Sequence, residues 1–289
     1  MKSIIQGNET MKNGLVIEDS KTYHSDLTAI SKSRLAKMSV CPQYFKWCED
    51  NPQEPSEDLI FGNAFHKLVL EPETFGKEFI VMPYIDRRTK QGKQLYEEFL
   101  QASAGRKIIT QEQYDTICKM RESIMANKYA VALLKGNHEH SFYAVDELTN
   151  EPIKVRLDCY RQVQDRIVIT DLKSCKSAIT EDFMKDVVKY SYDLQAYMYS
   201  NTVAKVMNIP QENVDFVFIA VEKKAPYMVN ILQADSFVLE RGEALFREYI
   251  GKYHECKETN NWYGLNGAYG IINNLSLPNY LLKEVIKGE

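Results

Sequence analysis

The clearest pattern of apolar and polar positions lies between residues 153 and 173. Two runs of strand-forming residues, IKVRLDCY and RIVITDLK, flank a polar break at residues 162–165. Apolar and polar residues alternate within the runs, and the second run contains the β-branched sequence IVIT. Such alternation around a short polar break is typical of two strands and a tight turn. The pattern therefore predicts an antiparallel hairpin.

Charged residues occupy the end of this predicted hairpin. Residues two apart in a strand share a face, so Asp171 and Lys173 are expected to point the same way. With the turn centred near Gln164, Asp158 lies on the neighbouring strand within about two residue pairs of Asp171. Two carboxylates and an ammonium group are thus expected together at one end of an apolar hairpin.

The rest of the chain alternates between helical and strand-like patterns. Residues 140–146 (HSFYAVD) predict a strand before the hairpin, and residues 214–221 and 227–232 predict two after it. Apolar residues at helical spacing are found in residues 27–47 (with a break at Cys41-Pro42), 61–70, 94–100, 111–134, 178–206 and 236–260. The predicted order along the chain is helices, three strands, a helix, two strands and a helix. This order predicts an α/β (α+β) core in which helices flank a mixed central sheet.

Length and polarity set the expected domain organisation. Residues 1–24 are polar and aperiodic, which predicts a flexible N-terminal arm. Residues 25–289 have the length of one domain, with a helical N-terminal part and an irregular C-terminal tail. The chain has no apolar stretch of membrane-spanning length and no signal-like N-terminus, so we expect a cytoplasmic protein without a membrane partner.

Charge and cysteine content narrow the possible chemistry. The net charge of −4 argues against a protein coated in basic residues, but it allows a local positive channel for a polyanion. The six cysteines form no CxxC pair, which favours reduced thiols, and Cys159 and Cys175 are expected to pack as small buried hydrophobes. The chain also lacks a phosphate-cradling glycine loop and a convincing Ser-His-Asp or Cys-His arrangement.

The paired carboxylates favour phosphodiester hydrolysis. Carboxylate oxygens are suitable ligands for Mg²⁺, which lowers the pKa of a bound water and neutralises charge on the reacting phosphate. Lys173 could orient or deprotonate that water or stabilise the transition state. The alternative is an ordinary surface hairpin in which Asp171 and Lys173 are solvated neighbours, because short D…DxK patterns recur by chance.

Further candidate residues lie outside the hairpin. His66, within the helical segment FGNAFHKLVL, is either a metal ligand or a hydrogen-bonded core histidine. Glu139 is a possible outer carboxylate. Arg34, with Lys32, could meet a phosphate or simply line a solvated face.

Two residues of the later helix are also candidates. Gln195 and Tyr199 lie four apart and hence on one helical face, where they could contact a phosphate or a base or belong to a tyrosine-rich packing face. A basic cluster could contact the nucleic-acid backbone or form a solvated loop; it comprises Arg87, Arg88, Lys90 and Lys93.

Four motifs of this chain, and their order along it, resemble those of the RecB/RecE-like branch of the PD-(D/E)XK nuclease superfamily. The resemblance is strongest to the phage-type exodeoxyribonuclease VIII-like domains of that branch. The four motifs are GNAFH with His66, RLD with Asp158, DLK with Asp171 and Lys173, and QAYMY as the family's QxxxY. Softer similarities, SKSRLAKMSVCPQYF and WYG…LPNYL, extend the resemblance over most of residues 25–282.

The resemblance implies a role for each motif residue. Asp158, Asp171, His66 and the carbonyl of Leu172 would bind Mg²⁺, for which Mn²⁺ could substitute. Lys173 would be the catalytic lysine, and Gln195 and Tyr199 would position DNA; Asp171 replaces the glutamate of some branches. Related helicase-linked and CRISPR-linked nucleases carry four cysteines for an iron–sulfur cluster. This chain lacks their C-terminal cysteine run, so no cluster is expected.

The implied activity is Mg²⁺-dependent exonuclease digestion of one strand from duplex DNA ends, 5′ to 3′. The resulting 3′ tail would be used by a RecT-like single-strand annealing protein in phage or prophage recombination within a bacterial host. The related phage exonucleases are toroidal, which implies a homo-oligomeric ring with the basic cluster as a candidate inner surface. The alternatives are a structure-selective or nicking endonuclease of the same fold, or an inactive DNA-end or partner-binding module. The intact acidic residues and lysine argue against the inactive module.

Overall fold

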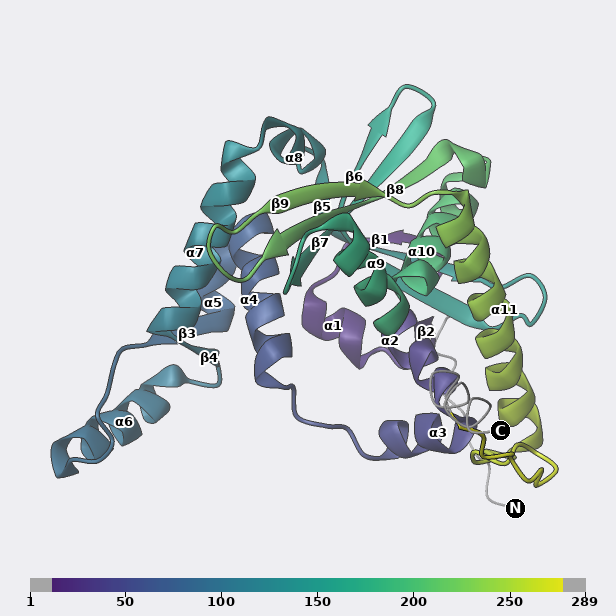
Figure 1. Ribbon diagram of the computed structural model, residues 1–289, viewed down its shortest axis with the longest axis horizontal. Coiled ribbons are helices and arrows are strands. Elements are labelled where there is room, and N and C mark those ends of the chain that lie inside the picture. The colour runs from purple at the N-terminus through teal and green to yellow at the C-terminus, as the bar shows by residue number, and fades with distance from the viewer. Residues whose placement is uncertain (1–11, 278–289) are drawn as a thin grey trace, which may run out of the picture.

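A mixed seven-stranded sheet forms the centre of the protein in the computed structural model, which describes residues 12–277. Six of its strands follow one path across the sheet: β1 (Gly14–Val16), β5 (Asn137–Val145), β6 (Pro152–Val163), β7 (Arg166–Cys175), β8 (Val214–Glu222) and β9 (Val229–Gln233). The short strand β2 (Ile30–Ser31) pairs in parallel with β6. Helices flank this sheet, which confirms the predicted fold class (Figure 1).

The predicted hairpin is formed by β6 and β7. The two strands pair antiparallel from Val163–Arg166 to Cys159–Thr170, and β5 pairs antiparallel with the other edge of β6. β7 then runs parallel to β8, and β9 returns antiparallel to β8. The apolar run of β7 is therefore paired on both sides within the sheet, where β-branched side chains pack well against neighbouring strands.

Two groups of helices cover the two faces of the sheet. One face packs against α4 (Glu57–Leu70) and α7 (Gln111–Ala126). The other packs against α9 (Thr180–Lys189), α10 (Tyr192–Met207) and α11 (Ser236–Thr259). Figure 1 shows these groups on opposite sides of the strands. The described residues consequently form two large apolar cores, with β7 and β8 contributing side chains to both, and a small third cluster of Tyr23, Ala29 and Tyr143.

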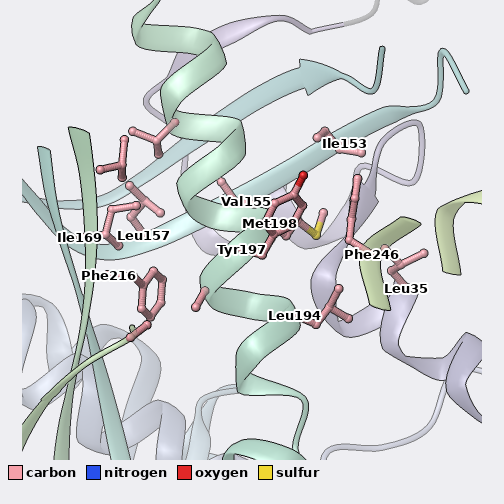
Figure 2. Packing of buried hydrophobic residues seen from close by; sticks show 14 of the residues in the cluster. Leu35, Ile153, Val155, Leu157, Ile169, Leu194, Tyr197, Met198, Phe216 and Phe246 are labelled. Atoms are coloured by element: carbon pink, nitrogen blue, oxygen red, sulfur yellow. The ribbon is translucent and has the colours of Figure 1, made fainter. Parts of the chain in front are cut away.

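Helix α10 lies at the centre of the larger core. Figure 2 shows Leu194, Tyr197 and Met198 of this helix between the sheet and the side chains of Phe246 and Leu35. A helix enclosed on several sides buries residues around most of its circumference. α11 approaches α10 closely at Gly242, where a Cβ atom would lie 2.2 Å from the Asp193 carbonyl oxygen. Close packing on both sides therefore holds α10 in a fixed position beside the sheet.

Two predicted long helices are each interrupted. The segment 111–134 forms α7 and a separate α8 (Lys128–Leu133), because the Asn127 side chain accepts hydrogen bonds from the first backbone N–H groups of α8. The segment 178–206 is divided into α9 and α10 at Ser191, which has a left-handed backbone with φ of 53°. These breaks are local, and the spacing of apolar residues does not predict them.

Residues 12–24 differ from the flexible arm that the sequence predicts. β1 pairs with β5, and α1 (Ser20–Ser25) buries Tyr23, whose hydroxyl donates to the carbonyl of Lys154. The sheet edge and this buried aromatic residue hold the segment in place. Residues 1–11 of the expected arm lie outside the described residues. The expectation of a single domain over residues 25–289 stays a prediction.

The next segment follows the predicted break at Pro42. α2 (Lys32–Leu35) continues into the 3₁₀ turn η1 (Ala36–Ser39), and α3 (Pro42–Asp50) begins with Pro42 in its first turn. Proline suits this position because the first helical N–H groups have no partner within the helix. The α3 helix buries Phe45 and Cys48 and leaves its other side exposed.

Residues 71–110 contain elements that apolar patterning does not reveal. After η2 (Pro72–Thr74) and α5 (Phe75–Glu78), the strands β3 (Phe79–Met82) and β4 (Lys107–Thr110) form a small parallel pair. Between them, α6 (Lys90–Ser103) is longer than the predicted segment 94–100 and extends away from the sheet in Figure 1.

The C-terminal part of the described chain completes the fold. The 3₁₀ turn η3 (Gln211–Asn213) precedes β8, and residues 260–277 form no helix or strand. No helix in residues 12–277 combines the length and apolar character that crossing a membrane requires.

Candidate active site

The candidate site lies where β6 and β7 separate. Their ladder ends at the Cys159–Thr170 pair, after which the side chain of Asp158 accepts a hydrogen bond of 2.7 Å from the backbone N–H of Leu172. Beyond this point β6 continues beside β5 while β7 continues beside β8. A cavity of about 410 Å³ opens here, lined by His66, Glu139, Asp158, Lys173, Gln195 and Tyr199, among others.

Asp158 is also held by a residue of helix α4. His66 reaches it from α4, with 3.2 Å between Nδ1 and the Oδ2 atom of Asp158. Burial alone would raise the pKa of Asp158, but the His66 imidazole, Lys173 and the Leu172 N–H lower it overall. Burial lowers the pKa of His66, and the charge and hydrogen bond of Asp158 outweigh this effect and raise it. An ionised Asp158 and a protonated imidazole thus stabilise each other.

Asp171 is the more deeply buried of the two aspartates, with 3% of its surface exposed. Its Oδ1 accepts a hydrogen bond of 2.5 Å from Nε2 of Gln195, and its Oδ2 forms an ion pair with Lys173. This pair confirms that Asp171 and Lys173 share a face of the strand. Burial raises the pKa of Asp171, and repulsion by Asp158 acts in the same direction against the attraction of Lys173. The site therefore concentrates negative charge in a region poor in water.

Glu139 adds a third carboxylate to the cavity. It lies within β5, not before it, and its backbone is left-handed with φ of 58°. Arg156 donates from Nε to Oε2 of Glu139 at 2.7 Å. Burial and the charge of Asp158 nevertheless raise the pKa of Glu139 above its usual value. Arg156 was not anticipated, although its position two residues before Asp158 was a usable signal.

The donor set of this cavity fits a divalent cation. No group of three or more His, Cys, Asp or Glu side chains in residues 12–277 is already gathered at metal-binding distance. However, among the described residues the only partner of the Oδ2 atom of buried Asp171 is the ammonium group of Lys173, and Asp158 and His66 open onto the cavity that Lys173 also lines. Carboxylate oxygens suit Mg²⁺, and the imidazole suits Mn²⁺ better. Asp158, Asp171 and His66 are therefore the residues that would hold such an ion.

Gln195 and Tyr199 both lie on the side of α10 that faces this cavity. The amide of Gln195 is committed to Asp171, so its structural role is to orient that carboxylate. The Tyr199 ring packs edge-on against Phe216, with 6.0 Å between the ring centroids. Burial raises the pKa of Tyr199 well above its usual value, which keeps its hydroxyl protonated and able to donate. Direct contact of either residue with DNA stays a prediction, as does the role of the Leu172 carbonyl.

Arg34 does not line this cavity. Its Nε and Nη2 atoms donate to Glu49 at 2.9 and 2.5 Å, and Nη1 donates to the carbonyls of Leu27 and Ala29. These contacts fasten α2 to α3 and to the preceding loop, so the expectation that Arg34 supports the active site is wrong. The guanidinium is occupied by structural hydrogen bonds.

Lys32, the neighbour of Arg34 in the predicted pair, does line the cavity. Its Nζ donates to the carbonyl of Tyr190 at 2.7 Å. Both Lys32 and Lys173 lie near the ring of Tyr192, at 5.6 and 4.8 Å from its centroid. Burial and the nearby charge of Lys173 lower the pKa of Lys32 to about 7. The importance of Tyr192, at the start of α10, was missed because its aromatic side chain resembled part of a packing face.

The basic cluster lies outside the cavity, around the start of α6. Arg87 stacks over Tyr96 at 4.7 Å, and Arg88 pairs with Asp86 at 2.9 Å. None of its four residues, Arg87, Arg88, Lys90 and Lys93, lines the candidate site. A contribution of this cluster to DNA binding stays a prediction.

The cysteines take no part in the site. All six are free thiols, and Cys159 and Cys175 are buried, which confirms their packing role. Burial raises the pKa of each of these two thiols to about 12. A thiol with so high a pKa is a poor nucleophile and a poor metal ligand at neutral pH.

Comparison with solved structures supports the fold, and the RecB/RecE-like branch that the motifs suggested stays a prediction. A solved structure of a candidate exonuclease from Eubacterium rectale has 14% sequence identity and a TM-score of 0.61, covering 93% of this chain and 98% of its own. At this identity the likeness establishes the fold alone. A second structure, named SSO0001, has 12% identity and a TM-score of 0.28, covering 75% of this chain and 96% of its own, and it carries no argument. A search of curated proteins found no match.

The family comparison is more decisive because it spans most of the chain. Residues 31–270 match a family described as a PDDEXK-like domain of unknown function (DUF3799). The matched range contains the whole central sheet except strand β1 and the first residue of β2. It also contains the cavity residues on α4, β5, β6, β7 and α10. The chain therefore belongs to this PDDEXK-like family, within the PD-(D/E)XK nuclease superfamily.

Proposed function

We propose that this protein is a Mg²⁺-dependent exodeoxyribonuclease that degrades one strand of duplex DNA from its ends. The observation that carries the proposal is that Asp158, His66 and Lys173 line one cavity at the separated ends of β6 and β7, and that Lys173 pairs there with the buried Asp171. Two carboxylates, an imidazole and an ammonium group are the side chains that metal-assisted phosphodiester hydrolysis requires.

Each residue of the site has its own role in the proposed reaction. Asp158 is oriented by the Leu172 N–H and by His66, and Asp171 is oriented by Gln195. A divalent cation, when bound by these groups, supplies a more acidic water and neutralises charge on the phosphate. Lys173 places its ammonium beside the same carboxylate, where it can donate to the attacking water or to charge that develops in the transition state.

Metal-dependent cleavage of end-labelled duplex DNA tests the proposal. The purified protein should release labelled nucleotides with Mg²⁺ and none with EDTA. Asp171→Asn preserves the shape of the side chain and removes its charge, and we expect it to lower cleavage by at least about 100-fold, a barrier change of about 3 kcal/mol. Asp182→Asn changes an exposed carboxylate of α9 and serves as the control. Near wild-type cleavage by Asp171→Asn would falsify the assignment.

The product distribution separates the proposed activity from an endonuclease of the same fold. An exonuclease should leave covalently closed circular duplex intact and should digest a linear duplex progressively from its ends. Phosphorothioate linkages at the 5′ ends alone should protect the duplex if digestion runs 5′ to 3′. Cleavage of the closed circle would instead support the endonuclease.

We also propose that the working form is a homo-oligomeric ring that supplies a 3′ tail to a single-strand annealing protein. With a net charge of −4, a monomer has little general attraction for DNA, whereas cyclic symmetry can direct the same basic patch inward from each subunit. The exposed cluster at the start of α6 is the candidate patch. Light scattering should show a closed oligomer, and processive digestion by a monomer would contradict the ring.

A further inference from the structure

A second cavity continues from the candidate active site toward α3. It has a volume of about 520 Å³, and His24, Ser31 and Ser33 line both cavities. The shared residues come from α1, β2 and α2, so the two cavities are neighbours along the N-terminal edge of the site. Leu27, Tyr44, Pro52 and Gln53 line the second cavity and not the first.

Two exposed aromatic rings of α3 lie at or next to this second cavity. Tyr44 lines the cavity, and Trp47 follows it one turn later on α3. The rings stack on each other at 6.3 Å with an angle of 19° between their planes, and 43% of Tyr44 and 49% of Trp47 is exposed. The buried ring of Phe45 packs α3 against the core. The fold therefore presents a flat aromatic pair that it does not need for its own packing.

The surroundings of this second cavity are positively charged. Arg34, Lys37 and Lys154 line it with one carboxylate, Glu49. Arg34 is paired with Glu49, which leaves Lys37 and Lys154 as the excess positive charge of the lining. The pKa of His24 reflects the same field, because burial lowers it first and the charges of Lys154, Arg156 and Lys107 lower it further. A local excess of cations in a chain with a net charge of −4 favours an anionic occupant.

We propose that this second cavity binds a short single-stranded DNA segment connected to the phosphate held in the active site. The proposal rests on the proposed nuclease function and specifies the path of its substrate. Exposed aromatic rings beside a basic groove bind unpaired bases by stacking, with the cations following the phosphates. Bases of an intact duplex are already stacked on one another, so the aromatic pair selects a strand that has separated from its complement.

Tryptophan fluorescence tests the predicted contact directly. The chain has two tryptophans, Trp47 and Trp262, and Trp262→Phe keeps an aromatic ring against Phe45 while leaving Trp47 as the reporter. In EDTA, where no cleavage occurs, oligothymidylate should quench this fluorescence in a saturable manner. An abasic oligonucleotide of the same length keeps the phosphates and lacks the bases, and it should bind at least about tenfold more weakly. Equal binding of the two oligonucleotides would overturn the proposal.

Removal of the rings provides a second, independent measurement. Fluorescence anisotropy with labelled oligothymidylate should show about a tenfold or larger loss of affinity for Tyr44→Ala/Trp47→Ala, the effect of losing a base–aromatic stack. Tyr129→Ala removes a ring that is 65% exposed on α8, outside both cavities, and should bind like the wild type. Less than a twofold change in the double variant would overturn the proposal.

These measurements separate the strand-binding site from the nuclease assignment because binding is measured without cleavage. If base-dependent binding is observed but the wild type cleaves no DNA, the strand-binding site stands and the proposed function fails. If the wild type cleaves DNA but binding is independent of the bases and of both rings, the proposed function stands and the strand-binding site fails.

Discussion

Gln195 of helix α10 and Asp171 of strand β7 are joined by a hydrogen bond of 2.5 Å. The bond fixes one carboxylate oxygen of Asp171 while the other faces Lys173. A carboxylate that must hold a cation loses less freedom on binding when a neighbour has already oriented it. In the proposed metal site, α10 would thereby contribute to metal binding without supplying a ligand itself.

Gln195→Ala should weaken the site through Asp171. Loss of the orienting amide is expected to raise the Mg²⁺ concentration for half-maximal cleavage by about tenfold or more. Titration of cleavage rate against Mg²⁺ measures the effect. Gln233→Ala removes the same type of contact, a 2.9 Å bond to Asp215 at the sheet edge, and should leave the titration unchanged. If both variants titrate alike, Gln195 does not act through the metal site.

Lys173→Ala should reduce turnover far more than DNA binding. Its ammonium acts on the attacking water or on charge that develops in the transition state, so we expect kcat to fall by about 100-fold or more. Single-turnover kinetics and a separate binding assay distinguish the two effects. Lys223→Ala, which breaks an exposed ion pair with Asp58, is the matched control. A variant that chiefly raised the dissociation constant would reduce Lys173 to an ordinary phosphate contact.

His66→Ala should shift the metal requirement of the enzyme. Removing the imidazole is expected to raise the half-saturating concentration of both cations, and Mn²⁺ should restore activity better than Mg²⁺. His254→Ala is the control, because His254 also faces a carboxylate, Glu151 at 2.9 Å, but at a place remote from the cavity lining. An unchanged metal titration for His66→Ala would return His66 to the role of a hydrogen-bonded core histidine.

Arg247→Met should destabilise the protein at neutral pH. Arg247 donates to Asp146 at 2.7 Å, and the Asp146 side chain is fully buried. Without its partner, the carboxylate is left charged in the core, at a cost of about 3 kcal/mol in the free energy of unfolding. Arg166→Met removes a more exposed pair with Asp215 and should cost about 1 kcal/mol or less. Chemical denaturation at pH 7 measures both, and equal losses would contradict the prediction.

The same pair predicts a pH dependence. Burial raises the pKa of Asp146, but the hydrogen bonds from Arg247 and Thr149 outweigh it, so the folded pKa lies below the unfolded value of about 3.9. The stability from this carboxyl is therefore fully present above pH 3.9 and is lost as the pH falls through its folded pKa. Arg247→Met should lack this acid-induced loss, and its deficit relative to the wild type should shrink below pH 4. A constant deficit from pH 7 to 3 would contradict this account.

The periodicity of apolar residues along the chain was sufficient to predict the larger helices and strands. The β6–β7 hairpin, the strands β8 and β9 and the helix α11 are found where alternation or helical spacing placed them. The pairing of Asp171 with Lys173 followed for the same reason, since the two-residue repeat of a strand is local. Elements of two to four residues, such as β2 and β3, are too short to carry such a repeat and were not foreseen.

Polar contacts between distant segments were the main source of error. Arg34 was a candidate phosphate ligand by composition, and it is instead occupied by Glu49 and two backbone carbonyls. Residues 12–24 looked polar enough for a loose arm, but pairing of β1 with β5 and burial of Tyr23 hold them. In both cases the deciding partner lies in a different element, which no local pattern of residues identifies.

The sequence by itself determined which side chains share a face within each strand or helix, because the backbone geometry of one element sets that repeat. It thereby specified the Asp171–Lys173 pair and the common face of Gln195 and Tyr199. Only the tertiary structure decided that His66 meets Asp158, that Gln195 orients Asp171 and that Tyr44 and Trp47 stand beside the same cavity system. Those contacts depend on how α3, α4 and α10 pack around the point where β6 and β7 separate, and packing is set by the burial of apolar surface across the whole fold.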